Sequence, residues 1–288
     1  MSVFVLKLIA VVSMLIDHTT YVLRLSGRLP YGTLYIIGRT IGRPAFLIFA
    51  FLLVNGFDRT QDRRKYLERL ILFAVISQIP FTLAFTGGNY QPAGASLLSF
   101  DALHTLPLLL PLLVFFFTVC ERKIRFSLLS LAAAFALYGL HWEVGGVCLL
   151  RGHMNVFYTL AAAMALMMSL DYILSPERSV PRALLILAAI AVEFYFVQQN
   201  ADYGLLGAAL IGGMYLCRKN RAAEFVFAAL WCLAEYGKSI PYLCGALFAL
   251  LPLLLYKGVR GPKLRSFFYV FYPAHLALLG VLFVYVIR

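Results

Sequence analysis

Ionisable side chains inside the apolar stretches of this sequence are the residues that could do chemistry. Asp17 and His18 are adjacent in the first apolar run, and Arg39 and Arg43 lie four residues apart in the second. On a helix, side chains four residues apart leave the same face, so both guanidinium groups would point the same way. Arginine stays charged in any plausible environment, so this pair needs an anionic partner. That partner would be Asp17, Glu193, or a phosphate or carboxylate of a ligand.

His18 is the side chain suited to accept a proton near neutral pH. The adjacent carboxylate of Asp17 would orient the ring or maintain its proton affinity. On spacing alone, a hydrogen-bonded interior histidine without chemistry explains His18 equally well. His275 lies two residues after Pro273, near the middle of the last apolar run. Ionisable groups at such depths usually face a protein interior or a wet cavity, which makes them functional candidates.

Composition indicates that these side chains belong to a membrane protein. Hydrophobic residues make up 62% of the 288 residues and charged residues only 13%, whereas a soluble domain needs about 25% charged residues to cover its surface. Within lipid, backbone amides must be paired internally, so only helices or a closed barrel can span. The apolar runs do not alternate with polar residues as barrel strands do. We therefore expect an all-α, polytopic integral membrane helix bundle.

Apolar segments define the helices expected in this bundle, about ten or eleven of them transmembrane, because the eighth and ninth are short for a span. We place them at residues 3–22, 33–57, 68–86, 97–119, 126–142, 154–174, 181–199, 203–217, 222–236, 240–257 and 265–286. No soluble domain interrupts them, so residues 1–288 are expected to form a single transmembrane domain.

The basic residues are unevenly distributed among the predicted loops. They crowd the loops after every even-numbered helix, whereas the odd-numbered loops contain only Arg24, Arg28, Arg151 and Lys238. The positive-inside rule then places the amino terminus and the even loops in the cytoplasm. The net charge of +12 is explained by this topology, so we expect no nucleic-acid partner.

No motif in the sequence points to a metal or a nucleotide. The five cysteines lie in or beside apolar runs and form no C-x-x-C pair. Neither H-E-x-x-H nor a phosphate-loop or dinucleotide-binding motif occurs. We expect packing roles for the cysteines and no bound metal.

With this topology, most intramembrane polar residues gather toward the extracytoplasmic side. Some of them, such as Asp202, fit ordinary helix caps or interfacial groups. The deeper ones are the stronger candidates for function or for supporting buried pairs. These are Asp17, His18, Arg39, Arg43, Glu193 and His275.

Several stretches carry a resemblance to a known family. Two early stretches, Leu6–His18 and Ile37–Phe57, are specific, and weaker ones follow at Ser77–Phe81, Asn155–Leu160, Asp202–Gly207 and Tyr272–Leu276. With these stretches the sequence resembles the TraX family of bacterial membrane proteins. The resemblance covers most of the chain. Residues 86–150 match least and look like extra helices relative to the family.

The resemblance implies acyl transfer at a bacterial inner membrane. The family's named member is linked to N-acetylation of conjugative pilin. The family is also similar to transmembrane acyltransferases, which move an acyl group from acyl-CoA to a sugar, lipid or peptide. For this sequence it implies acetyl-CoA or another acyl-CoA as donor, with His18 as catalytic histidine and Asp17 as its companion. Together with the depth of the polar residues, it makes the following candidate substrate-binding residues: Arg39, Arg43, Asn55, Gln78, Glu193, Tyr203 and His275.

Two positions depart from the family pattern, and two other function classes stay open. Glutamate is expected where this sequence has Asn55 and Gln78, so two carboxylates have become amides. A proton-coupled transporter would also place polar residues within a helical bundle, although no inverted repeat with paired broken helices is evident. An inactive membrane scaffold predicts instead that Arg39 and Arg43 pair wholly with internal carboxylates.

Overall fold

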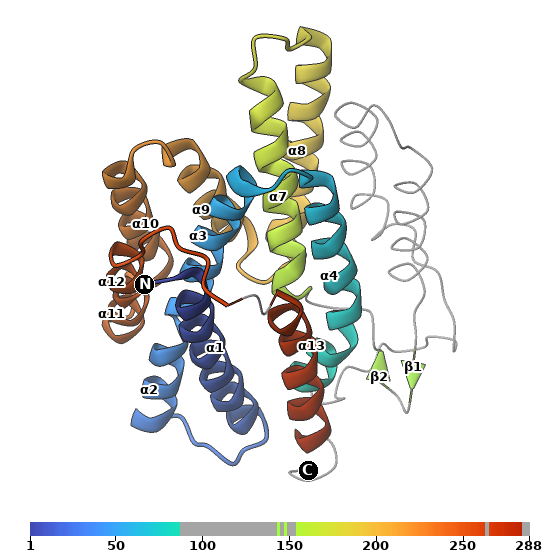
Figure 1. Cartoon of the computed structure of the whole chain (residues 1–288). Coiled ribbons are helices and arrows are strands. Elements are labelled where there is room, and N and C mark those ends of the chain that lie inside the picture. Colours follow the sequence, from blue (N-terminus) through green and yellow to red (C-terminus); the bar gives the residue numbers. More distant parts are fainter. Residues whose placement is uncertain (87–142, 145–146, 149–153, 263–264, 284–288) are drawn as a thin grey trace. The chain divides into compact units, whose positions relative to one another are not determined.

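The computed structural model describes residues 1–86, 143–144, 147–148, 154–262 and 265–283, and these are largely helical (Figure 1). Their β-structure is a two-residue antiparallel pair, β1 (Glu143–Val144) with β2 (Val147–Cys148), and one isolated bridge between Met154 and Ala201. Four helical stretches in these ranges are long and apolar enough to cross a membrane, one of them the proline-containing stretch Thr33–Arg59, and three shorter apolar helices accompany them. The predicted all-α membrane class is therefore confirmed.

Nine of the eleven predicted segments are helical, and the other two, 97–119 and 126–142, lie outside the described residues. The observed helices are α1 (Val3–Leu25), α2 (Thr33–Gly42), α3 (Pro44–Arg59), α4 (Arg63–Thr86), α7 (Val156–Ile173), α8 (Val180–Asn200), α9 (Gly204–Cys217), α10 (Arg221–Tyr236), α11 (Ile240–Phe248), α12 (Leu250–Leu254) and α13 (Arg265–Val281).

Prolines interrupt two helices that the sequence predicted as continuous. Residues 33–57 form α2 and α3, because Pro44 has no N–H to donate to the carbonyl of Thr40. The N–H of Arg43 bonds to that carbonyl instead, at 3.2 Å. Residues 240–257 likewise form α11 and α12, and Pro252 cannot donate to the last carbonyl of α11.

Polar side chains begin several of the helices by accepting the first free N–H groups. The hydroxyl of Ser2 accepts from Val5 in α1, and the amide oxygens of Asn155 and Asn220 cap α7 and α10. Before α4, the carboxylate of Asp62 accepts the N–H of Lys65 at 2.9 Å. That bond lowers the pKa of Asp62 from its ordinary value.

The described residues fall into two compact units. The first contains α1, α2, α3, the end of α4 from Leu83, the end of α9 from Gly213, and α10 to α13. The second contains the rest of α4 and α9 together with α7 and α8. Each unit is described by itself.

In the first unit, α1 presents a face of small and polar side chains to α2 and α3. Its buried positions include Ala10, Ser13, Asp17 and Thr20, which recur with helical spacing. Val5, Leu8, Val12 and Leu15 recur with the same spacing on an exposed face. In a membrane protein an exposed apolar face is the one that suits lipid.

Glycines let α2 approach the polar face of α1 closely. Gly38 and Gly42 form a Gly-x-x-x-Gly pair on α2, the spacing typical of close helix contacts in membranes. A Cβ atom at Gly42 would lie 2.2 Å from the Cβ of Asp17, and one at Gly38 would lie 2.2 Å from the hydroxyl of Thr20. Gly245 of α11 approaches α2 from another side, where a Cβ would lie 2.3 Å from the carbonyl of Thr40.

The first unit brings together several helix ends and loops that the pattern of basic residues predicted to lie on the same side of the membrane. Backbone N–H groups of Val3 and Phe4 donate to the carbonyls of Val259 and Arg260. Arg59 at the end of α3 donates to Gly258 at 2.9 Å. These bonds bring together the amino-terminal segment, the end of α3 and the 255–261 loop. The alternation of basic loops predicted that these segments share one side of the membrane.

We predict that Gly38→Ala lowers the thermal unfolding midpoint of the detergent-solubilised protein. The new methyl group would collide with the side chain of Thr20, and overpacking of this kind costs about 1–3 kcal/mol. The double variant Thr20→Ala/Gly38→Ala removes the colliding atoms and should unfold closer to wild type. Gly32→Ala is the matched control, because nothing lies within 4 Å of a Cβ there. Unfolding of Gly38→Ala at the wild-type temperature would contradict the close approach.

Candidate active site

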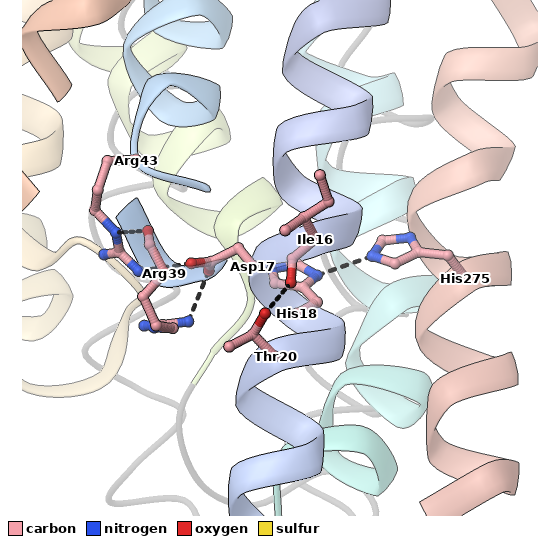
Figure 2. Close-up of polar contacts among 7 residues, drawn as sticks. All are labelled: Ile16, Asp17, His18, Thr20, Arg39, Arg43 and His275. Carbon is pink, nitrogen blue, oxygen red and sulfur yellow. Dashed lines mark hydrogen bonds and ion pairs between the residues drawn. The ribbon is translucent and has the colours of Figure 1, made fainter. Parts of the chain in front are cut away.

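A single carboxylate in the first unit joins both arginines that the sequence selected. Arg39 Nη1 lies 2.7 Å from Asp17 Oδ2, and Arg43 Nη2 lies 2.8 Å from Asp17 Oδ1 (Figure 2). The three side chains are only 20%, 11% and 13% exposed for Arg39, Arg43 and Asp17. Of the anionic partners that the sequence left open, Asp17 is the one that the described structure pairs with them.

The break between α2 and α3 directs Arg43 toward this carboxylate. Because the N–H of Arg43 bonds to Thr40, the carbonyl of Arg39 lacks its usual helical donor. Arg43 Nε donates to that carbonyl at 2.9 Å. The guanidinium group thus closes the end of α2 with one nitrogen and reaches Asp17 with another.

Aromatic rings flank both guanidinium groups. The ring of Tyr21 lies 4.8 Å from the guanidinium carbon of Arg39, and the rings of Tyr236 and Tyr242 lie 5.6 and 5.4 Å from that of Arg43. Contacts of this geometry stabilise a cation by about 0.5–2 kcal/mol. Sequence reasoning missed these tyrosines, because they lie on other helices than the arginines and only tertiary packing brings them together.

The cluster of Asp17, Arg39 and Arg43 has a net formal charge of +1, since two guanidinium groups share one carboxylate. Charges removed from water are tolerated only when paired and hydrogen-bonded, and the bonds of both guanidinium groups to Asp17 meet that condition. The shared carboxylate is the internal pairing that a scaffold predicts.

His18 pairs with the other histidine that the sequence selected. His18 Nδ1 and His275 Nε2 are 2.8 Å apart, and the two rings are nearly parallel, with 11° between their planes and centroids 5.1 Å apart, so that they meet end to end through these nitrogens. Phe85 and Tyr272 meet the His18 ring edge-on, at 5.0 and 6.1 Å. His275 is only 5% exposed, whereas His18 is partly exposed.

The structure corrects the expected role of Asp17 toward His18. Consecutive helical residues point about 100° apart, and Figure 2 shows the two side chains leaving α1 in different directions. Both carboxylate oxygens accept from guanidinium groups, and the partner found for His18 Nδ1 is His275. Asp17 therefore positions the arginines, and a histidine from α13 contacts the imidazole.

In the second unit, Gln78 belongs to a buried amide network that joins α4 to the start of α7. Asn155 donates to Gln78 Oε1 with its side-chain amide at 2.9 Å and with its backbone N–H at 3.2 Å. It also donates to the carbonyl of Ala74 at 2.7 Å. Gln78 and Asn155 are both 0% exposed. The glutamate expected at position 78 would accept the same two bonds.

The other candidate residues have local backbone contacts or undescribed side chains, and these do not indicate a function. Asn55 lies on α3 and donates to the carbonyl of Phe51 on the same helix at 3.0 Å. Tyr203 precedes α9 with a positive φ of 62°, and its carbonyl accepts from Gly207 at 2.8 Å. Glu193 lies within α8, and its side chain is outside the described residues. Among the residues that are described, no group of three or more His, Cys, Asp and Glu could hold a metal ion.

The first unit thus defines a class: a helical membrane protein with a paired histidine and a fixed arginine pair on neighbouring faces of one helix. The family model described as TraX protein matches residues 2–170 and again residues 147–283. The chain therefore belongs to the TraX family. It is also similar to a probable fimbrial assembly protein FimC, serogroup H1, from Dichelobacter nodosus. The two are 26% identical over an alignment of 293 residues in length, which covers 96% of this chain and 94% of that protein. No solved structure matches.

We predict that Asp17→Asn destabilises the protein more than Arg39→Met does. Loss of the carboxylate removes the ion-pair partner that both buried cations share, and breaking a buried ion pair costs about 3–5 kcal/mol. Loss of Arg39 instead leaves Asp17 and Arg43 as a neutral pair. Thermal unfolding of the purified variants in detergent measures the difference. Equal destabilisation by both variants would argue against the shared carboxylate.

For the second unit, we predict that Gln78→Leu is destabilising and that Gln78→Glu is much milder. Leucine removes the acceptor of two buried donors of Asn155, and an unmade buried hydrogen bond costs about 1–3 kcal/mol. Glutamate in its protonated, neutral form retains an acceptor oxygen at the same position. The midpoints of thermal unfolding test this order, and a Gln78→Glu protein less stable than Gln78→Leu would reverse it.

Proposed function

We propose that this protein is a membrane-embedded acyltransferase that moves an acyl group, acetyl first of all, from acyl-CoA to an amine or hydroxyl. The observation that carries this proposal is the imidazole of His18. It is partly exposed, and another histidine anchors it through one ring nitrogen at 2.8 Å. An anchored imidazole is the geometry that a general base requires.

The transfer needs one proton acceptor and one source of positive charge. The nitrogen or oxygen of the acceptor attacks the thioester carbonyl carbon while His18 takes its proton. The carbon–sulfur bond then breaks, and the proton passes from His18 to the leaving CoA thiolate. Arg39 and Arg43, held in place by Asp17, supply fixed positive charge toward the negative charge that develops on the thioester oxygen.

The donor would approach from the side on which the basic loops meet. We place this side in the cytoplasm of the bacterial cell and the bundle in its inner membrane, following the positive-inside rule. Exposed cations at these ends of the first unit suit the phosphates of acyl-CoA: Arg59, Lys219, Lys257 and Arg260. His18 lies fifteen residues along α1 from Val3, or about 22 Å at 1.5 Å per residue. The long pantetheine arm of the donor would cover this depth.

The name of one similar protein suggests which acceptor to test first. The similar protein from Dichelobacter nodosus is named for fimbrial assembly, so a pilin-type peptide amine or hydroxyl is the acceptor that we propose to test first. Glycan and lipid acceptors complete the series.

A proton-coupled transporter is the second candidate, and the broken helices favour it. Pro44 and Pro252 each remove one helical hydrogen bond, where α2 meets α3 and where α11 meets α12, while Arg43 and Ala249 keep helical backbone angles. Transporters commonly place helix interruptions at their binding sites. Proton-driven uptake by proteoliposomes that lack acyl-CoA would support transport. Transfer of label without uptake would support the enzyme.

We predict that His18→Ala abolishes acyl transfer while leaving the protein folded. The purified protein in nanodiscs, given radiolabelled acetyl-CoA and a pilin-type peptide, should label the peptide. Loss of a general base lowers such rates on the order of 10²–10⁴-fold. Leu15→Ala, on the exposed face of the same helix, is the matched control and should retain activity. Equal labelling by wild type and His18→Ala would remove His18 from the mechanism.

A further inference from the structure

We infer that His275 fixes the tautomer of His18, so that the ring nitrogen presented to substrate is Nε2. Its catalytic consequence rests on the acyltransferase function proposed above, whereas the tautomer itself follows from the hydrogen bonds alone. His275 is thus a positioning residue that acts through another side chain.

The argument begins at a backbone carbonyl. His275 Nδ1 lies 2.8 Å from the carbonyl oxygen of Phe271, one helical turn earlier on α13. A carbonyl oxygen only accepts hydrogen bonds. The proton of a neutral His275 ring must therefore sit on Nδ1, and its Nε2 carries a lone pair.

That lone pair determines the state of the next ring. His275 Nε2 lies 2.8 Å from His18 Nδ1. Since His275 Nε2 has no proton to give, His18 Nδ1 must donate, and a neutral His18 has its lone pair on Nε2. The two hydrogen bonds therefore run in one direction: His18 donates to His275, and His275 donates to the carbonyl of Phe271. They mirror the arrangement in which a carboxylate orients a catalytic histidine, with a neutral imidazole in place of the carboxylate.

The surroundings keep this arrangement in place. His275 is buried, with Phe271 stacked on it at 4.9 Å and Tyr272 edge-on at 5.5 Å. These contacts restrict rotation of the His275 ring. Of the two residues, His18 is the more exposed. When His18 accepts a proton at Nε2, its Nδ1–H continues to donate to His275. The added charge is then stabilised without a second proton transfer.

Nitrogen-15 NMR of imidazole-labelled protein in nanodiscs tests the tautomer directly, because the protonated and unprotonated ring nitrogens have widely separated shifts. The His18 signals are assigned by their loss in His18→Ala. We expect a protonated Nδ1 and a bare Nε2 for His18 in the wild type. In His275→Leu the acceptor is gone, and His18 should move to the Nε2–H form. In His275→Gln the side-chain oxygen can replace the lost acceptor, so the Nδ1–H form should persist.

The NMR outcomes do not depend on activity. A bare Nδ1 on wild-type His18, or a tautomer unchanged in His275→Leu, would overturn the inference even if acyl transfer is confirmed. If His275→Leu fails to fold, the wild-type spectrum and His275→Gln still decide.

Kinetics then test the consequence for the proposed reaction. We expect His275→Leu to lower kcat on the order of 10²-fold with little change in the KM for acetyl-CoA, and His275→Gln to recover most of it. Leu278→Ala, at an exposed position three residues later on α13, is the matched control. If the predicted tautomer is seen but wild type transfers no acyl group, the proposed function fails and the tautomer assignment stands. If wild type is active and His275→Leu retains its kcat, the positioning role fails.

Discussion

Two guanidinium groups placed among apolar helices impose the main constraint on the first unit. Neither arginine can shed its charge, so an anion must reach both of them, and Asp17 does so at 2.7 and 2.8 Å. This requires the backbones of α1 and α2 to lie closer than ordinary side chains allow. Gly38 and Gly42 meet that requirement, and each immediately precedes one of the arginines. The Gly-Arg repeat therefore encodes the close approach and the charge together.

On α1, the adjacent residues Asp17 and His18 have different partners on different faces of the helix. Both oxygens of Asp17 accept from arginines, and its side chain leaves α1 in a different direction from the adjacent imidazole (Figure 2). His18 finds its partner on α13, more than 250 positions away in the chain. The arginine pair thus lies against one face of α1, and an anchored imidazole leaves another face of the same helix. The proposed acyl transfer, which must both remove a proton and stabilise a developing anion, would use these two features together.

Much of this organisation could be predicted from residue types, and its limits have physical causes. Composition and apolar run length predicted the helical membrane class, and the spacing of Arg39 and Arg43 predicted a shared face that needs an anion. Sequence adjacency misled the assignment for Asp17 and His18, because neighbours along a helix diverge by about 100°. The breaks in 33–57 and 240–257 were missed because prolines are often tolerated in membrane helices. The tyrosines around Arg43 and the link from Gln78 to Asn155 depend on tertiary contacts that no local pattern encodes.

A neutral partner for His18 is consistent with where the ring lies. A second carboxylate beside it would bring another charge out of water, and that charge would itself need a counter-ion. An imidazole orients the ring by hydrogen bonding alone, and its other nitrogen is satisfied by the carbonyl of Phe271. The partners found for the two histidines are thus uncharged. In the proposed acyl transfer the pair would acquire charge only when a proton is transferred, which is the condition under which stabilising that charge accelerates a reaction rather than merely binding a substrate.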